Sequence, residues 1–143
     1  MQLQRQYNVL LIGDSCTDEW AYGSCDRLSP EAPIPVMKFR EHQSAPGMAA
    51  NVNQNLESLG INVNFLTNRE KIVKTRYVDE KSNQQIMRLD TEPDIKPLHP
   101  SQLTMAAMHS EYDAVVISDY DKGFVGYDVI ELLAKQNPNI KIF

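Results

Sequence analysis

The sequence has no apolar stretch close to the roughly 20 residues that a membrane-spanning helix needs. It also has no run of Lys or Arg, and its net charge of −5 argues against a nucleic-acid-binding face. The first residues, M-Q-L-Q-R-Q-Y, are polar and lack the apolar core of a secretory signal. These absences predict a cytoplasmic protein that binds neither membranes nor nucleic acid.

Familiar catalytic and metal-binding patterns are also missing. The sequence contains no P-loop, no dinucleotide-binding glycine motif and no serine-histidine-aspartate arrangement. The only two cysteines, Cys16 and Cys25, have no metal-type partner pattern, so we expect them to be reduced thiols. The sequence therefore predicts no metal site, and any function has to be sought in other residues.

Buried strands and helices alternate along the chain. The apolar runs 7–13 and 112–118 are typical of buried parallel strands. Residues 48–59 have helical apolar spacing, and Gly60 suits the end of that helix. Further predicted elements are a strand over 62–67, helices over about 101–110 and 124–136, and a strand that starts at 140. This order predicts an α/β fold with a parallel sheet.

Three other segments do not fit this alternation. Two prolines in residues 32–40 exclude a central strand and predict an edge strand or a protruding ribbon. Residues 72–79 and 84–90 are predicted to be paired strands, because a polar, turn-like stretch joins them. We expect these segments to form a small, separate β layer.

Polar side chains are predicted to gather at the carboxyl end of the parallel sheet, where such sheets bind ligands. Asp14 follows the first strand and Asp119 follows the strand over 112–118, while Gly47 and Asn51 open a helix near the same rim. Carboxylates and amides suit a polyhydroxylated ligand. Two alternatives remain open: Asp14 as a cap or turn residue, and Lys122 as a solvated lysine rather than a phosphate ligand. Asp18 is expected in the loop after the first strand.

Five segments together resemble the ribokinase-like (PfkB) carbohydrate kinases. They are V-L-L-I-G-D-S-C-T-D-E-W-A-Y-G, R-L-S-P-E-A-P-I-P-V, P-G-M-A-A-N-V-N-Q-N-L-E-S-L-G, N-Q-Q-I-M-R-L-D and V-V-I-S-D-Y-D-K-G. Within that family they most resemble the heptose 7-phosphate kinase domain of the bifunctional ADP-heptose synthesis enzyme. S-P-E-A-P-x-P-V and N-Q-Q-x-x-R-L-D are typical of the heptose kinase branch, whereas P-G-x-A-A-N is common in the wider family.

The resemblance implies a partial ribokinase-like α/β fold, with helices on both faces of the sheet and a β-sheet lid. It implies transfer of the ATP γ-phosphate to a sugar hydroxyl with Mg²⁺, and a sugar or sugar phosphate as partner. Related kinases often pair through their lids, so a homodimer is also expected. The resemblance implies that the sugar pocket is lined by Asp14, Asp18, Gly47 and Asn51. It implies that the lid strands face the sugar or its phosphate with Asn83, Gln84 and Arg88. Asp119 and Lys122 match a loop on the substrate side.

The sequence departs from the family in three ways. Gly47-Met48 replaces a Gly-Gly pair that acts as a hinge for lid closure. About five residues follow Thr67 before the next strand, where the family has a further strand and helix. The family's catalytic segment, G-A-G-D, and its nucleotide pocket lie beyond the position of Phe143.

We therefore expect residues 1–143 to be the truncated N-terminal part of a carbohydrate kinase domain, with lid strands at about 32–40, 72–79 and 84–90. This part is expected to contain no catalytic residue, to bind no cofactor and to be inactive alone; a complementing C-terminal half is a further expected partner. Two alternatives are a non-catalytic sugar-phosphate-binding or regulatory module, and an interaction protein that pairs through its lid.

Overall fold

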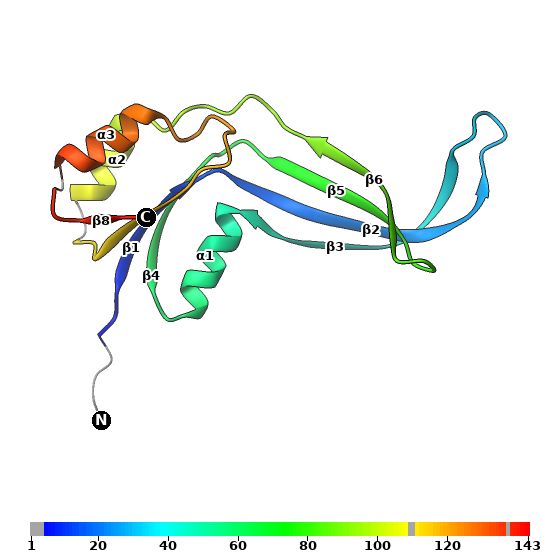
Figure 1. The fold of residues 1–143 in the computed structure, drawn as a ribbon, viewed down its shortest axis with the longest axis horizontal. Coiled ribbons are helices and arrows are strands. Elements are labelled where there is room, and N and C mark those ends of the chain that lie inside the picture. Colours follow the sequence, from blue (N-terminus) through cyan, green and yellow to red (C-terminus); the bar gives the residue numbers. More distant parts are fainter. Residues whose placement is uncertain (1–4, 109–110, 137) are drawn as a thin grey trace. The chain divides into compact units, whose positions relative to one another are not determined.

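A computed structural model describes residues 5–108, 111–136 and 138–143 (Figure 1). The chain divides into two compact units. The first unit contains residues up to 16, residues 46–71 and residues 93–143, and the second contains residues 17–45 and 72–92. Both predicted layers are therefore present.

The first unit is built on a parallel sheet with the strand order β4-β1-β7-β8. Its strands are β1 (Asn8–Gly13), β4 (Asn62–Thr67), β7 (Ala114–Ser118) and β8 (Lys141–Ile142). The apolar run N-V-L-L-I-G makes β1 an inner strand, because its side chains are buried on both faces of the sheet. The predicted parallel sheet is confirmed.

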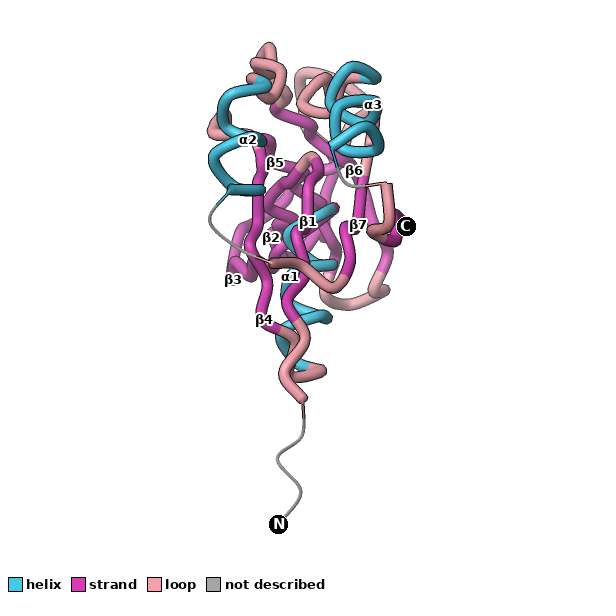
Figure 2. Tube along the Cα trace, turned by 90° about the vertical axis from the view of Figure 1, so that its left-hand side faces the viewer, coloured by secondary structure: helices cyan, strands magenta, loops and turns pink. Residues whose placement is uncertain are grey.

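Helices cover both faces of this sheet (Figures 1 and 2). They are α1 (Ala49–Ser58), α2 (Pro100–Met108) and α3 (Tyr127–Gln136). Leu10 and Ile12 of β1 point to the face that α2 and α3 cover, and form one core cluster with Leu103 and Leu133. The other face receives α1.

Gly13 explains how closely α1 approaches the sheet. A Cβ atom at this position would lie 2.8 Å from the Ala49 Cβ and 2.2 Å from the Ser118 carbonyl oxygen. Only glycine lets the backbones of β1, β7 and α1 come this close. The carboxyl ends of two strands and the start of a helix therefore meet at one place.

The second unit is a four-stranded sheet with the strand order β3-β2-β5-β6. Its strands are β2 (Ser15–Leu28), β3 (Pro35–Met48), β5 (Ile72–Asp79) and β6 (Gln84–Thr91). β5 and β6 pair antiparallel, with an extra residue on β6 opposite Tyr77 and Val78. The predicted fold class, a parallel sheet covered by helices plus a small second sheet, is confirmed.

Some predicted boundaries were wrong. Asp18 lies within β2 rather than in a loop, because a 14-residue strand begins at Ser15, directly after Asp14. Similarly, β3 spans Pro35–Met48, so it continues eight residues beyond the predicted end at residue 40. Positions 109–110 of the predicted helix 101–110 lie outside the described residues. None of the helices in the described ranges is long and apolar enough to cross a membrane.

Candidate functional site

Asp14 organises the carboxyl end of the first unit's sheet. Its side chain is fully buried, and its Oδ2 accepts hydrogen bonds from the backbone N–H groups of Tyr120 at 2.9 Å and Lys122 at 3.3 Å. Its Oδ1 accepts a third from the N–H of Phe124 at 3.2 Å. Its backbone carbonyl accepts a fourth from Ala49 at 2.9 Å. One residue thus fixes both the loop 119–124 and the start of α1.

These bonds define what the Asp14 carboxylate can do chemically. A carboxylate offers about four lone-pair positions, and here the protein's own backbone occupies three of them. Hydrogen bonds from several N–H donors fix the position and orientation of a buried carboxylate. The geometry therefore supports the turn-residue interpretation of Asp14, while a direct contact between Asp14 and a sugar stays a prediction.

The loop that Asp14 holds presents more polar groups at the same end of the sheet. Asp119 is exposed, and its Oδ1 accepts a hydrogen bond from the N–H of Asp121 at 2.8 Å. The loop is tightly folded, because Asp121 has a φ of 55° and Gly123 a φ of 98°. Asn51 is exposed in the first turn of α1, two residues after Ala49. The structure therefore brings Asp14, Asn51, Asp119 and the Lys122 backbone to one end of the sheet.

Gly47 and Met48 form the last two residues of β3, and both are buried. Met48 has a φ of 54° and a ψ of −132°, and no side chain caps the helix that follows it. These angles match the first central position of a type II′ turn, which glycine usually occupies. Met48 thus adopts a glycine-like conformation at the position where the resembling family has its second glycine.

The second unit holds Asp18 in an ion pair. The Asp18 carboxylate lies 2.7 Å from a guanidinium nitrogen of Arg76, and both side chains are partly buried. The same guanidinium lies over the Trp20 ring, 5.3 Å from its centroid. Asp18 therefore has a charged partner within its own sheet.

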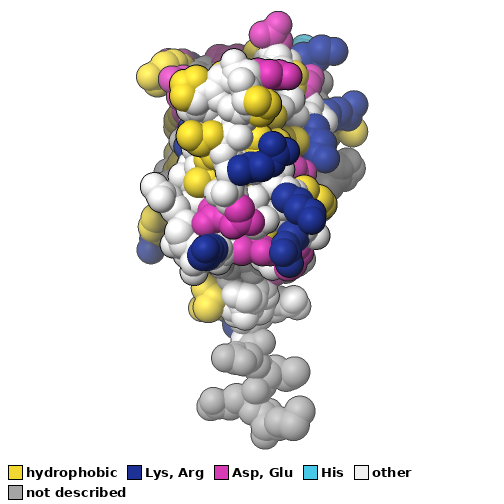
Figure 3. Space-filling model, turned by 90° about the vertical axis from the view of Figure 1, so that its right-hand side faces the viewer, with side chains coloured by type: hydrophobic (Ala, Val, Ile, Leu, Met, Phe, Trp, Pro, Cys, Tyr) yellow, Lys and Arg dark blue, Asp and Glu magenta, His cyan; other side chains and the backbone are white. Residues whose placement is uncertain are grey.

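Arg88 lies directly opposite Arg76 in the antiparallel register of β5 and β6. It forms two bonds with the Asp90 carboxylate, at 2.8 and 2.9 Å, yet its side chain remains 50% exposed. Two arginines, each with its own carboxylate, therefore stand side by side on this sheet. The face drawn in Figure 3 likewise carries basic and acidic side chains beside hydrophobic ones.

The other two predicted lid residues lie where β5 turns into β6. Asn83 has a φ of 55°, and the N–H of Gln84 donates to the Ser82 hydroxyl at 3.3 Å. In a regular strand, residues four apart, such as Gln84 and Arg88, point to the same face. The extra residue on β6 lies between these two and interrupts this alternation, so the sequence spacing alone does not place their side chains on one face.

The turn between β5 and β6 depends on Asp79, which the sequence reasoning missed. Its carboxylate accepts hydrogen bonds from the hydroxyl and N–H of Ser82 and from the N–H of Cys25. The Ser82 hydroxyl, followed by these backbone donors, lowers the pKa of Asp79 below its ordinary value. Burial, together with the Asp79 and Asp26 charges, raises the pKa of the Cys25 thiol. We call this set of hydrogen bonds from Ser82 to Asp79 the Asp79 cap of the turn. The local signal for it in the sequence is an Asp three residues before a Ser in a polar turn.

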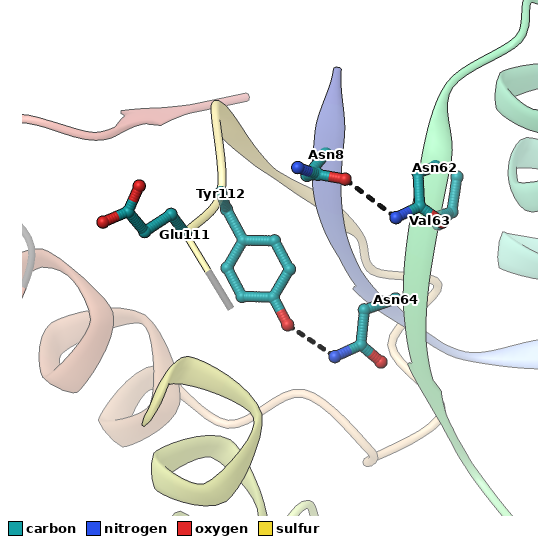
Figure 4. A pocket seen from close by; sticks show the side chains of 6 residues that line it. All are labelled: Asn8, Asn62, Val63, Asn64, Glu111 and Tyr112. Atoms are coloured by element: carbon teal, nitrogen blue, oxygen red, sulfur yellow. Dashed lines mark hydrogen bonds between the residues drawn. The ribbon is translucent and has the colours of Figure 1, made fainter. Parts of the chain in front are cut away.

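The described residues of the first unit line hollows at both ends of its parallel sheet. One, of about 390 Å³, is at the amino-terminal edge of the sheet and is lined by Asn8, Asn62, Val63, Asn64, Glu111 and Tyr112 (Figure 4). Its amides are mostly engaged with their neighbours: Asn62 donates to Asn8 at 2.8 Å, and Asn64 donates to the Tyr112 hydroxyl. The other, of about 250 Å³, is at the carboxyl end of β4, where Arg69 and Lys96 are among its lining residues. No sequence motif identifies either hollow.

Solved structures with the same fold are carbohydrate kinases. A carbohydrate kinase from Agrobacterium tumefaciens matches 96% of this chain with a TM-score of 0.58 and 12% identity, and this chain covers 52% of it. The ribokinase of Arabidopsis thaliana, solved with ribose and ATP, matches 96% of this chain with a TM-score of 0.54 and 10% identity, and this chain covers 53% of it. The chain therefore has the ribokinase-like fold.

In sequence, the chain is similar to bifunctional proteins named HldE, although no protein-family model matches it. The HldE protein of Helicobacter acinonychis (strain Sheeba) is 33% identical over 166 residues, which cover 94% of this chain and 36% of that protein. The chain thus spans about a third of the length of the curated relatives it matches. The resemblance to ribokinase-like kinases, and to HldE proteins among them, is confirmed.

The link between β4 and β5 is short, because only residues 68–71 separate Thr67 from Ile72. β4 is an edge strand of the described sheet. The loss of one strand and one helix at this link, relative to the family, stays a prediction.

Proposed function

We propose that this chain forms the acceptor-binding part of a carbohydrate kinase of the heptose-phosphate type. The observation that carries the proposal is the Asp14 network, which holds α1 and the loop 119–124 together at the carboxyl end of the sheet. Ligands of open parallel sheets bind at this end. The similarity to HldE proteins and to sugar kinases supports a sugar or sugar phosphate as the ligand.

Within this proposal, Asn51 and Asp119 are the side chains that contact sugar hydroxyls, because both are exposed next to the Asp14 network. Asp14 and Gly47 shape the site and Lys122 lies on its loop. The family resemblance assigns Asp18, Asn83, Gln84 and Arg88 of the second unit to the substrate as well, with that sheet acting as a lid.

ATP with Mg²⁺ supplies the transferred phosphoryl group in kinases of this type. Among residues 5–108, 111–136 and 138–143, no group of three His, Cys, Asp or Glu side chains is arranged to hold a metal ion. The G-A-G-D segment does not occur in the sequence. We therefore assign no residue of this chain to the cofactor, and propose that residues 1–143 act as the N-terminal part of a kinase domain.

The size of the expected rate losses supports the further proposal that residues 1–143 alone do not catalyse phosphoryl transfer. A missing general base costs roughly 10²- to 10⁴-fold in rate. A missing anion hole costs about another 10²- to 10³-fold, and phosphoryl transfer also depends on a positioned nucleotide. Assaying the purified chain with ATP and heptose 7-phosphate tests this directly, and clear turnover refutes it.

Calorimetry with heptose 7-phosphate and no ATP tests the proposed acceptor site. Asn51→Ala and Asp119→Asn are each expected to weaken binding about tenfold, because each removes one or two hydrogen bonds to the ligand. Asn55→Ala and Asp94→Asn are matched controls, since both residues are exposed and neither belongs to the proposed site. Equal effects in the two sets of variants contradict the assignment.

One observation favours an alternative function in pairing. All eight residues of β6, an edge strand of the second sheet, are exposed, including Ile86, Met87 and Leu89. Exposed apolar edge strands pair with other chains. A lid-mediated homodimer, or a complementing C-terminal half, would cover this strand. Light scattering of the purified chain is expected to give a mass above that of the monomer, and a clean monomer argues against pairing.

A further inference from the structure

The hollow at the carboxyl end of β4 has a charge of the opposite sign to the chain as a whole. The sequence has 19 acidic and 14 basic residues. In contrast, Arg69 and Lys96 line this hollow together, opposed by a single carboxylate, that of Glu70. The two cations come from separate segments, one following β4 and one preceding α2. The chain fold therefore concentrates positive charge at this point.

Neither cation is neutralised by a carboxylate of the described residues. Within the described ranges, Arg69 and Lys96 form no ion pair, whereas Arg5, Lys74, Arg76 and other basic side chains do. Both side chains are exposed, so their donors are accessible to a ligand. Two unpaired cations at one hollow repel each other, and an anion bound between them relieves that repulsion.

The start of α2 adds further donors. The Oε1 of Gln102 accepts a hydrogen bond from the N–H of His99 at 3.3 Å, which leaves the NH₂ group of Gln102 as a donor. The Nδ1 of His99 lies 2.8 Å from the Ser101 hydroxyl, so its Nε2 is the nitrogen left for a ligand. The N-terminal end of a helix also carries partial positive charge.

We propose that this hollow binds the phosphate group of a phosphate monoester. A monoester carries about −1.5 to −2 charges near neutral pH, which matches two cations, and the planar Arg69 guanidinium suits its oxygens. The volume of about 250 Å³ holds a phosphate and a few attached atoms. It is below the roughly 300–1,000 Å³ of pockets that enclose larger molecules, which argues against a whole nucleotide.

The site is distinct from the proposed acceptor contacts but adjoins them. Phe124 lines the hollow, its N–H donates to Asp14, and its carbonyl accepts a hydrogen bond from Leu98. The proposal requires neither a sugar contact at Asn51 nor phosphoryl transfer. Failure of the proposed function would therefore leave this phosphate site untouched, and failure of this site would leave the proposed function untouched.

The test is a titration of the ¹⁵N-labelled full chain, followed by amide NMR at constant ionic strength. Three probes are compared: inorganic phosphate, glycerol 3-phosphate and glycerol. Saturable shifts are expected at residues 67–70, 96–102 and 124 with the first two probes and not with glycerol. Arg69→Gln and Lys96→Gln are each expected to weaken binding about tenfold, the loss of one charge-assisted hydrogen bond. Glu70→Gln is expected to strengthen it about threefold, because it removes a like charge.

Lys141→Gln is the matched control, because it removes one exposed positive charge from the same unit but outside the hollow. Unchanged thermal midpoints in all variants show that folding is intact. Shifts elsewhere on the chain, or equal weakening by Lys141→Gln, indicate an adventitious ion and overturn the proposal. If inorganic phosphate binds and glycerol 3-phosphate does not, the assignment to a phosphate monoester is overturned.

Discussion

Met48 provides a direct test of the strained joint between β3 and α1. Its φ of 54° and ψ of −132° are angles that glycine accepts easily. Holding another residue in so sparsely populated a region costs about 1–3 kcal/mol. Glycine relieves this strain, but its more flexible unfolded state costs about 0.5–1 kcal/mol relative to alanine. Met48→Gly should therefore be more stable than Met48→Ala by about 1 kcal/mol.

Comparing the two variants with each other removes the contribution of the methionine side chain. Met48 is only 9% exposed, and either substitution loses its burial, worth about 1.5–3 kcal/mol. Gln54, exposed in the middle of α1, is the matched control position. There the order should reverse, with glycine about 1 kcal/mol less stable than alanine.

Urea unfolding followed by circular dichroism measures all four variants, with the slope of the transition checked for constancy. The strain argument predicts opposite signs at positions 48 and 54. If alanine is the more stable residue at both positions, Met48 is not strained and the reasoning is wrong.

Three further substitutions test other parts of the structure. Gly13→Ala should destabilise the chain by about 1–3 kcal/mol in urea unfolding, because the new Cβ would meet the Ser118 carbonyl oxygen at 2.2 Å; an unchanged midpoint refutes the close packing. Asp14→Asn should cost about 2–3 kcal/mol and increase hydrogen exchange in the loop 119–124, since its NH₂ group cannot accept the loop's N–H bonds; retained protection contradicts this role. The lowered pKa of Asp79 contributes stability that is present above about pH 4 and is lost as pH falls through the folded-state value. The stability difference between wild type and Asp79→Asn should therefore shrink on acidification, and a constant difference argues against the cap.

Local signals predicted the elements of this fold. The apolar run that forms β1 and the helical spacing before Gly60 each determine an element from neighbouring residues alone. Gly60 indeed has a φ of 78° just after α1. The two prolines in 32–40 correctly indicated that this part of the chain lies outside the parallel sheet, in what became the edge strand β3.

The arrangement of the site depends on contacts that local signals do not contain. The Asp14 carboxylate bonds to N–H groups more than 100 residues away, so its role as the support of the loop was only one of two open interpretations. The bulge on β6 breaks the alternation that sequence reasoning relies on. Arg69 and Lys96 belong to no motif, and only the fold brings them together. The residue types were visible in the sequence, but which distant residues come into contact was not, and the arrangement of the site depends on those contacts.

The central claim is that a sugar phosphate binds at the end of the sheet that Asp14 organises. Amide NMR of the full chain during a titration with heptose 7-phosphate tests it most directly. We predict saturable shifts in residues 119–124 and in the first turn of α1. Absence of binding, or shifts confined to the opposite edge around Asn8 and Asn62, would contradict the account.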